Sequence, residues 1–335
     1  MNQPITILAI ESSCDETAAS VIVDGKILSN FIANQTVHEK YGGVVPELAS
    51  RAHMENIVPV VDAALKKAFP ELTRNEQLAK LNAIAFTQAP GLIGSLLVGA
   101  QFAKSMALAL NIPLIAVHHM QAHVLANLID DPKPNYPFLC LTVSGGHTQI
   151  VKCNSASEMH ILGETIDDAA GEAFDKVARL LNLGFPGGPL IDKQALAGNK
   201  TEINFPRGLT APADLEKHKY DFSFSGLKTA VARYLAQTPN YKKTDVAASF
   251  QEAVVDVLIT KSLAACKESG IDKLIIAGGV AANHRLRELA KQRCESAKVE
   301  LRIPPANLCT DNGAMVAALG SLAINEGVAA SEIGI

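Results

Sequence analysis

Two stretches of the chain share one pattern of apolar and polar positions. Residues 5–27 (ITILAIESSCDETAASVIVDGKI) and residues 138–151 (FLCLTVSGGHTQIV) each contain a β-rich apolar run, a tip of small polar residues and a second β-rich run. This pattern predicts a β-hairpin whose tip presents backbone N–H groups and hydroxyls. A concave set of such donors suits an anion, above all a phosphate. The repeat therefore predicts two related lobes, each holding one side of a nucleotide.

Between and after the hairpins, apolar positions follow helical and strand periods in turn. Helices are expected at 46–68, 91–110, 166–183, 226–237 and 244–269, and buried strands at 81–90 and 113–119. Residues 272–292 have the pattern of a strand, a glycine turn and a helix. A Pro-Gly turn is expected at 186–189, with irregular structure from there to about 225. The alternation of strands and helices indicates an α/β fold.

The composition narrows the class of protein. At 335 residues the chain is long enough for two domains of ordinary size. Hydrophobic residues make up 48% and charged residues 19%, as in a globular enzyme with large cores. The net charge of −4 does not indicate a nucleic-acid binder, so a polyanion site must be a local patch. The basic cluster at 285–293 (Arg285, Arg287, Lys291, Arg293) is expected to be a solvated helix face.

The cysteine pattern and the hydropathy indicate the cellular compartment in which the protein is expected. The six cysteines include no C-x-x-C pair and no zinc-ribbon spacing, so a reducing cytosol is expected. The N-terminus MNQPITI lacks the charged region and cleavage site of a signal peptide. The longest apolar stretch, 91–110, contains Gln101, Lys104 and three glycines, and is interpreted as a buried amphipathic helix. No membrane contact is expected.

A pair of histidines is the first candidate for chemistry. His119 and His123 are four residues apart on a predicted helix, so their imidazoles share one face, a spacing that suits a divalent transition metal. Asp311, near the start of another predicted helix, is a candidate third ligand. The alternative is two partly exposed helix histidines without a metal. The segment HMQAH lacks the glutamate of H-E-x-x-H, which argues against a zinc protease.

The two hairpin tips differ in their polar residues. Gly145 and Gly146 in SGGHT let a backbone approach a phosphate closely. The other tip carries Asp15 and Glu16, and a carboxylate repels a phosphate unless it acts through a cation or a water. Asp15 is therefore a candidate metal-linked or water-orienting group, with an Asx-turn or a helix cap as the alternative.

Several residues of the second half could hold a nucleoside. Asp175 lies one turn past a glycine on a predicted helix, where its carboxylate could accept two ribose hydroxyls. Gly187 and Gly188 could let a sugar lie against the backbone. In IIAGGVAAN the glycines could admit a flat base, and Asn283 could bond its edge.

Nine motifs together carry a family resemblance. They are ESSCDET, YGGVVPELASR, PGLIGSLLVG, HHMQAH, VSGGHTQ, IDDAAGEAFDK, FSFSGLKTA, AGGVAAN and CTDNGAM, in this order from about residue 5 to 325. The chain resembles the tRNA N6-adenosine threonylcarbamoyltransferases in their bacterial form. The resemblance implies the two-lobed fold of actin, sugar kinases and heat-shock chaperone ATPases. The expected lobes are 1–111 with 312–335, and 112–311, with the active site in the cleft between them.

The resemblance also implies an activity. Members transfer the threonylcarbamoyl group from threonylcarbamoyl-AMP to the N6 amine of adenosine at position 37, in tRNAs that read codons beginning with A. It implies one metal ion per subunit, iron in preference to zinc, on His119, His123 and Asp311. Asp15 and Glu16 match acidic positions beside the reacting groups. The expected nucleotide ligands are Thr142, Val143, Ser144, Gly145 and Gly146 at the phosphate and Asp175, Gly188, Asp192 and Asn283 at the ribose and base. Expected partners are tRNA, a degenerate homologous subunit and a small P-loop ATPase, in the cytoplasm.

The chain departs from the family pattern at two places near the metal. Gln121 and Ala122 stand where Glu-Gly is common, and Thr142 stands where some relatives have a tyrosine, which implies one protein ligand fewer and more water on the metal. Two other functions stay open. A small-molecule kinase of the same fold explains the hairpins but not the histidine pair, because such kinases hold magnesium through water and carboxylates. A non-catalytic scaffold subunit does not need the histidines, Asp311 and the glycine tip.

Overall fold

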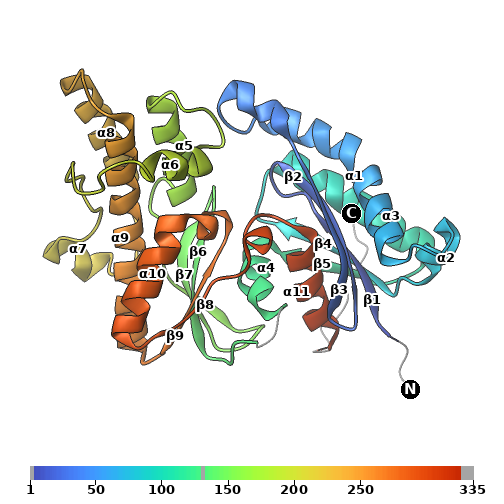
Figure 1. Ribbon diagram of the computed structural model, residues 1–335. Helices are drawn as coiled ribbons and strands as arrows, with labels where there is room; N and C mark the ends of the chain where they lie inside the picture. The colour runs from blue at the N-terminus through green and yellow to red at the C-terminus, as the bar shows by residue number, and fades with distance from the viewer. Residues whose placement is uncertain (1–3, 130–132, 326–335) are drawn as a thin grey trace. The chain divides into compact units, whose positions relative to one another are not determined.

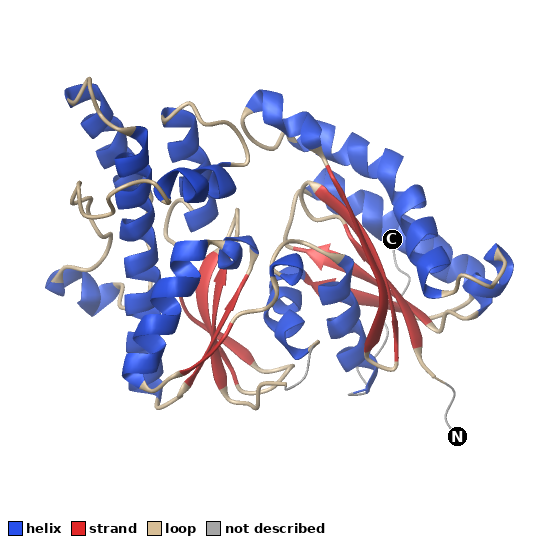
Figure 2. Cartoon of the chain, in the orientation of Figure 1, coloured by secondary structure: helices blue, strands red, loops and turns tan. Residues whose placement is uncertain are grey.

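The structure, a computed structural model, describes residues 4–129 and 133–325 (Figure 2). It divides into two compact units, Met1–Lys133 with Asp311–Ile335, and Pro134–Thr310. The division falls later than the expected boundary at 111/112, because β5 (Leu114–His118) pairs with β4 (Ala83–Ala89) in the sheet of the first unit. Asp311 also belongs to the first unit rather than to the second.

The first unit contains the first predicted hairpin in a five-stranded sheet. β1 (Thr6–Glu11), β2 (Glu16–Val23) and β3 (Lys26–Asn34) are antiparallel, and β4 and β5 continue parallel to β1, in the order β3-β2-β1-β4-β5. The β2–β3 turn has φ 48° at Asp24 and φ 78° at Gly25. Two residues with positive φ are what a tight hairpin turn requires, so Asp-Gly explains the turn.

The second unit repeats this arrangement. β6 (Phe138–Val143), β7 (Thr148–Cys153) and β8 (Met159–Glu164) form the antiparallel part, and β9 (Lys273–Ala277) and β10 (Glu300–Arg302) continue in parallel. The order β10-β9-β6-β7-β8 is that of the first sheet read from the other end. The duplication predicted from the two hairpins is therefore confirmed.

Helices cover both faces of the first sheet (Figure 1). α1 (Pro46–Ala68) and α3 (Ile93–Leu110) lie on one face, and α4 (His119–Leu125) and α11 (Gly313–Asn325) on the other. β1 alternates accordingly: Leu8 and Ile10 pack with α1 and α3, and Ile7 and Ala9 pack with α4 and α11. The remaining helical segments of this unit are η1 (Thr36–Tyr41), α2 (Arg74–Ala79) and η2 (Ala126–Leu128).

Helix α3 is only partly buried, unlike the expectation for residues 91–110. Its length and composition alone would allow it to cross a membrane, and 22% of it is buried. The buried stripe consists of small residues at a spacing of four: Ser95, Gly99, Ala103 and Ala107. Ile93, Leu97 and Leu108 are exposed. The fully buried positions of the helix are therefore small, and larger residues such as Phe102 and Met106 pack beside them while partly exposed.

The second unit has one large core around helix α9. Its elements are α5 (Ala170–Leu180), α6 (Gly187–Ala195), α7 (Pro212–Lys217), α8 (Ser225–Gln237), α9 (Lys243–Ser269), η3 (Gly279–Ala282), α10 (His284–Ala297) and η4 (Ala306–Leu308). Phe174, Phe222 and Phe250 lie in this core. The turn predicted at 186–189 is wrong, because Gly187 begins helix α6. The segment expected to be irregular also contains α7.

The structure also corrects the expected start of α5 and the expected exposure of the basic cluster in α10. Helix α5 begins later than residue 166, since Asp167 accepts hydrogen bonds from the backbone and hydroxyl groups of Ser225 and from Ser223. The basic cluster of α10 is not a free solvated face. Arg285 pairs with Glu252 and Glu288, and Arg293 pairs with Asp256. Arg287 donates to the Ala281 and Pro304 carbonyls. These arginines therefore stabilise the unit rather than offering charge to a polyanion.

Candidate metal and nucleotide sites

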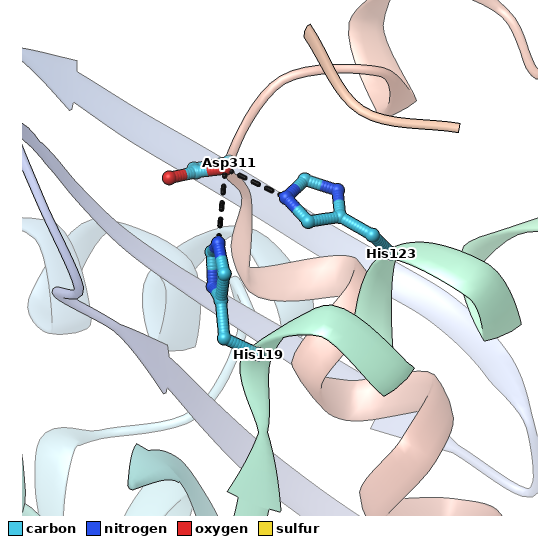
Figure 3. Close-up of side chains that lie close together, drawn as sticks. All are labelled: His119, His123 and Asp311. Carbon is cyan, nitrogen blue, oxygen red and sulfur yellow. Dashed lines mark hydrogen bonds and ion pairs between the residues drawn. The ribbon is translucent and has the colours of Figure 1, made fainter. Parts of the chain in front are cut away.

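The two histidines and the distant aspartate meet in the first unit. His119 begins α4 directly after β5, His123 follows one turn later, and Asp311 lies just before α11 (Figure 3). Asp311 Oδ1 is 2.9 Å from His123 Nε2 and 3.6 Å from His119 Nε2. His119 is 6% exposed and His123 1%. Both imidazoles are therefore buried, and the alternative of two partly exposed helix histidines is wrong.

The donor set fits a divalent transition metal. Two imidazole nitrogens and a carboxylate oxygen are a common protein contribution to a zinc or iron site that keeps a position open. In a tetrahedral site with metal–ligand bonds of about 2.0–2.1 Å, neighbouring ligand atoms are about 3.3 Å apart. The separations of 2.9 and 3.6 Å bracket this value, and all three ligand atoms lie within 4.8 Å of one another. Only small side-chain movements would be needed to enclose an ion.

The electrostatics of this cluster depend on burial and on opposite charges. Burial lowers the pKa of His119, but the carboxylates of Asp311 and Glu11 outweigh it and raise that pKa to about 9. Burial raises the pKa of Asp311, yet the imidazoles of His119 and His123 bring it below the usual range. Without a metal, His119 is therefore protonated at neutral pH, and an ion that binds its Nε2 must displace a proton.

Glu11 was not singled out from the sequence, although it contacts a proposed ligand. It ends β1 and is fully buried. Its Oε2 accepts from Thr87 Oγ1 at 2.5 Å and lies 3.2 Å from His119 Nδ1. Its Oε1 accepts from the Ser13 N–H at 2.5 Å. Burial raises the pKa of Glu11, but His119 and Thr87 lower it further, so the carboxylate stays charged. The sequence feature that could have identified Glu11 is an acidic residue at the end of an apolar strand.

The first hairpin tip is held in place on several sides. The Ser13 carbonyl accepts from the Leu92 N–H at 2.7 Å, and Ser12 Oγ donates to the Ser95 carbonyl at 3.0 Å. The Cys14 carbonyl is bonded by His53 Nε2 at 3.0 Å and by Ser95 Oγ at 3.2 Å. Contacts from α1 and α3 therefore fix the backbone that carries the next two residues.

The two predicted catalytic acids follow this fixed segment. Asp15 and Glu16 are half-buried, and Glu16 begins β2. Burial, together with the carboxylates of Asp311 and Asp15, raises the pKa of Glu16 well above its ordinary value. The neighbouring acids therefore disfavour the charged form of Glu16.

The second hairpin tip is open. The Ser144 N–H donates to the His147 carbonyl at 2.8 Å, and the His147 N–H donates to Ser144 Oγ at 3.1 Å, which closes the turn. Gly145 and Gly146 at its apex are exposed, and a Cβ added at either would meet no atom within 4 Å. Thr142 and Val143 are buried in β6, where both pair with β7 and Thr142 also pairs with β9.

The elements that carry the other predicted nucleotide ligands lie in the same unit as this tip, and close backbone contacts hold them together. A Cβ at Gly171 would lie 2.5 Å from the Ser144 carbonyl, and one at Gly278 would meet the Val143 carbonyl. Glycine at these positions therefore lets the start of α5 and the turn after β9 pack against the hairpin. The Gly187 N–H donates to Asp175 Oδ1 at 2.7 Å, which ties α6, with Gly188, to α5.

Two predicted ligands, Asp192 in α6 and Asn283 at the start of α10, already have protein partners. Asp192 Oδ2 accepts from the His284 N–H at 3.2 Å and lies 2.6 Å from His284 Nδ1, while its buried Oδ1 has no partner among the described residues. Asn283 Oδ1 caps α10 by accepting from the Leu286 N–H at 2.9 Å, and its Nδ2 donates to Gln251 at 2.7 Å. The Asn283 side chain therefore joins the start of α10 to α9.

Comparison with known proteins decides the family. A model of the family described as TsaD, tRNA N6-adenosine threonylcarbamoyltransferase, matches residues 26–318. The chain belongs to this family. A tRNA N6-adenosine threonylcarbamoyltransferase of Cytophaga hutchinsonii is 50% identical over 94% of this chain and 90% of its own length. One of Clostridium botulinum (strain Hall) is 52% identical over 94% of this chain and 92% of its own length.

Solved structures support the fold. Full-length HypF in a phosphate- and nucleotide-bound form is similar over 98% of this chain, with a TM-score of 0.63 and 15% identity. HypF of T. kodakarensis gives a TM-score of 0.64 and 14% identity over 96% of this chain. This chain spans about half of each HypF chain, 47% and 49%. The predicted fold class, two α/β units with duplicated hairpins, is confirmed.

Proposed function

We propose that this chain transfers the threonylcarbamoyl group from threonylcarbamoyl-AMP to the N6 amine of adenosine 37 in tRNAs that read codons beginning with A. In this reaction the amine nitrogen forms a bond to the carbamoyl carbon, the bond from that carbon to the phosphate oxygen breaks, and AMP leaves. The amine loses one proton. The observation that carries the proposal is the buried cluster of His119, His123 and Asp311 in a chain of this family.

A metal ion bound by this cluster would supply positive charge that stabilises an oxygen on which negative charge develops. His119, His123 and Asp311 would hold one ion per subunit, which we propose to be iron, with zinc as the other candidate. Asp15 is proposed to orient the amine or take its proton. The fixed backbone of Ser12–Cys14 would keep Asp15 in one position. If Asp15→Asn transferred the group at the wild-type rate, this role would be excluded.

The second unit is proposed to bind the adenylate. The open apex of Gly145 and Gly146 would let backbone N–H groups approach the phosphate. Asp175 and Gly188 are proposed for the ribose, Asp192 for a further sugar contact and Asn283 for the base. The buried Asp192 Oδ1 supports this assignment, because a buried carboxylate oxygen without a partner is costly and a ribose hydroxyl could donate to it.

We propose that the enzyme acts in the cytoplasm, with a degenerate homologous subunit and a small P-loop ATPase. We propose that its tRNA binds a surface other than the paired arginines of α10.

Transfer to tRNA can be distinguished from phosphorylation by one experiment. The metal-loaded chain, with its partner subunits, is incubated with threonylcarbamoyl-AMP and unmodified tRNA, and modified adenosine is measured by mass spectrometry. We expect modification by the wild type and none by His119→Ala. A kinase would leave the tRNA unmodified and would consume ATP with a small-molecule acceptor, and a scaffold would do neither.

The neighbouring histidine provides a matched control. His118 is exposed and uses its ring nitrogen to cap α4 by accepting from the Gln121 N–H. Asparagine also caps helices well, so His118→Asn removes an imidazole without removing the cap. It should keep wild-type activity. Equal loss of activity in His118→Asn and His119→Ala would mean that the damage comes from the helix and not from a metal ligand.

A further inference from the structure

The carboxylate of Glu11 makes three contacts, each toward a different part of the first unit. Its donors are the Ser13 N–H in the hairpin tip, Thr87 Oγ1 at the end of β4, and His119 Nδ1 at the start of α4. Glu11 is fully buried, so water cannot replace any of these partners. The donors come from positions 2, 76 and 108 residues away along the chain.

We propose that Glu11 is a positioning residue that fixes the tautomer and ring orientation of His119 for metal binding. This inference rests on the metal site of the proposed function. A neutral imidazole carries its proton on one nitrogen, and a carboxylate can only accept. Once an ion has displaced the Nε2 proton, the contact with Glu11 keeps the remaining proton on Nδ1 and leaves the lone pair of Nε2 on the side that faces Asp311. A carboxylate behind a ligating histidine also makes it a stronger ligand.

The second histidine of the cluster, His123, lacks the carboxylate partner that His119 has. His123 Nε2 also faces Asp311, but His123 Nδ1 is buried without a hydrogen-bond partner among the described residues. Of the two imidazoles, His119 alone has an acidic partner at Nδ1 in the part of the chain that the structure describes. If Glu11 served only to accept hydrogen bonds from the backbone at the end of β1, it would not need an imidazole as a partner.

Glu11 also links the metal ligands to the hairpin tip. Its second oxygen accepts from the Ser13 N–H, and Ser13 Oγ donates to Asp311 Oδ2 at 3.4 Å. One carboxylate thus sets the position of His119 directly and that of Asp311 through Ser13. Loss of its charge should disturb two ligands of the site at once.

The first test is metal affinity, measured by competition with a chelator for zinc and for cobalt(II). Glu11→Gln keeps the shape, but its amide can donate as well as accept, so the tautomer of His119 is no longer enforced. We expect binding weaker by about 10- to 100-fold, as for other outer partners of ligating histidines, and a changed visible spectrum of the cobalt form. Thr87→Val removes a donor to the same oxygen and leaves the His119 contact, so its effect should be smaller.

A second glutamate–histidine pair, remote from the proposed metal ligands in the chain, provides the control. Glu158 Oε1 lies 3.2 Å from His160 Nε2 on the surface of the second unit, both side chains being more than half exposed. Glu158→Gln should leave metal affinity and the cobalt spectrum unchanged.

The second test needs no change to Glu11. In the zinc-loaded wild type labelled with ¹⁵N-histidine, the His119 signal is assigned by its loss in His119→Ala. We expect a proton on Nδ1 and zinc on Nε2. Zinc on Nδ1 would overturn the proposal, as would wild-type metal affinity in Glu11→Gln. If the wild type binds no metal, or His119→Ala binds as tightly as the wild type, the metal site itself fails. These outcomes separate the two claims.

Discussion

The two hairpin tips have the same place in two similarly ordered sheets but opposite surroundings. The first, between β1 and β2, is bonded to Glu11, Leu92, Ser95 and His53, and a Cβ at Gly91 would lie 2.6 Å from its Ser13 carbonyl. The second, between β6 and β7, has an exposed apex with nothing within 4 Å of a Cβ at Gly145 or Gly146. One tip is filled by protein, and the other leaves room for a ligand.

This difference shows how a duplicated unit can acquire two roles. In the first unit the space at the tip is taken by side chains that position acids and histidines, which suits a centre where charge must be held in place. In the second unit the backbone of the tip is left accessible, which suits reversible binding of a phosphate. If the two roles are separate, a substitution at one tip should leave the function of the other intact.

The largest expected effect is loss of the metal by removal of a ligand. His123→Ala should lower zinc or iron affinity by more than the about 10- to 100-fold cost of losing an outer partner, because a ligand itself is removed. Its AMP affinity, measured by calorimetry, should stay at the wild-type value. Loss of AMP binding in this variant would contradict the separation of the two roles.

The metal site should depend strongly on pH. The pKa of His119 is about 9 in the metal-free protein, so at lower pH an ion must displace its proton. Metal affinity should rise by about tenfold per pH unit up to about pH 9 and then level off, for one displaced proton. Chelator competition between pH 6 and 10 measures this slope. A flat profile from pH 7 to 9 would show that His119 is neutral before the metal binds.

The filled tip should be sensitive to added volume. Gly91→Ala places a methyl group against the Ser13 backbone, and we expect the free energy of unfolding to fall by about 1–3 kcal/mol, as for other overpacked sites. Denaturant unfolding measures it. An unchanged midpoint would mean that the tip can move away, and that it is less fixed than its hydrogen bonds indicate.

The open tip should tolerate the same change without loss of stability. Gly145→Ala and Gly146→Ala should change the free energy of unfolding by no more than about 0.5 kcal/mol, as for other surface substitutions. The methyl group would instead occupy the space proposed for the phosphate, and AMP affinity should fall by about tenfold, or 1.4 kcal/mol. A variant that keeps full affinity would remove the apex from the nucleotide site.

Much of the fold could be predicted from local patterns. The helix expected at 46–68 and the hairpins follow from apolar periodicity and from Asp24-Gly25. Helix α6 was missed because Pro186, Gly187 and Gly188 are typical of a turn, yet the approach of Gly187 to Asp175 favours a helix start there. The boundary at 111/112 failed because pairing of β5 with β4 is a long-range contact.

The site residues that could be predicted are those marked by their spacing or by the family resemblance. His119 and His123 lie within one helical turn, so their shared face follows from the sequence. Asp311 is 188 residues from His123, and only the packing of α11 beside α4 explains why they meet. Glu11 has no motif spacing to His119, so its role became visible only in the structure. The expected position of the active site between the two lobes stays a prediction.

The most direct test is a crystal structure of the protein with AMP and iron or zinc, with diffraction data collected at the absorption edge of the metal. The account predicts one anomalous peak about 2.0–2.2 Å from His119 Nε2, His123 Nε2 and an Asp311 oxygen. It predicts the phosphate of AMP on the backbone of Gly145 and Gly146. A metal bound elsewhere, or a phosphate on the Ser12–Asp15 tip, would contradict the account.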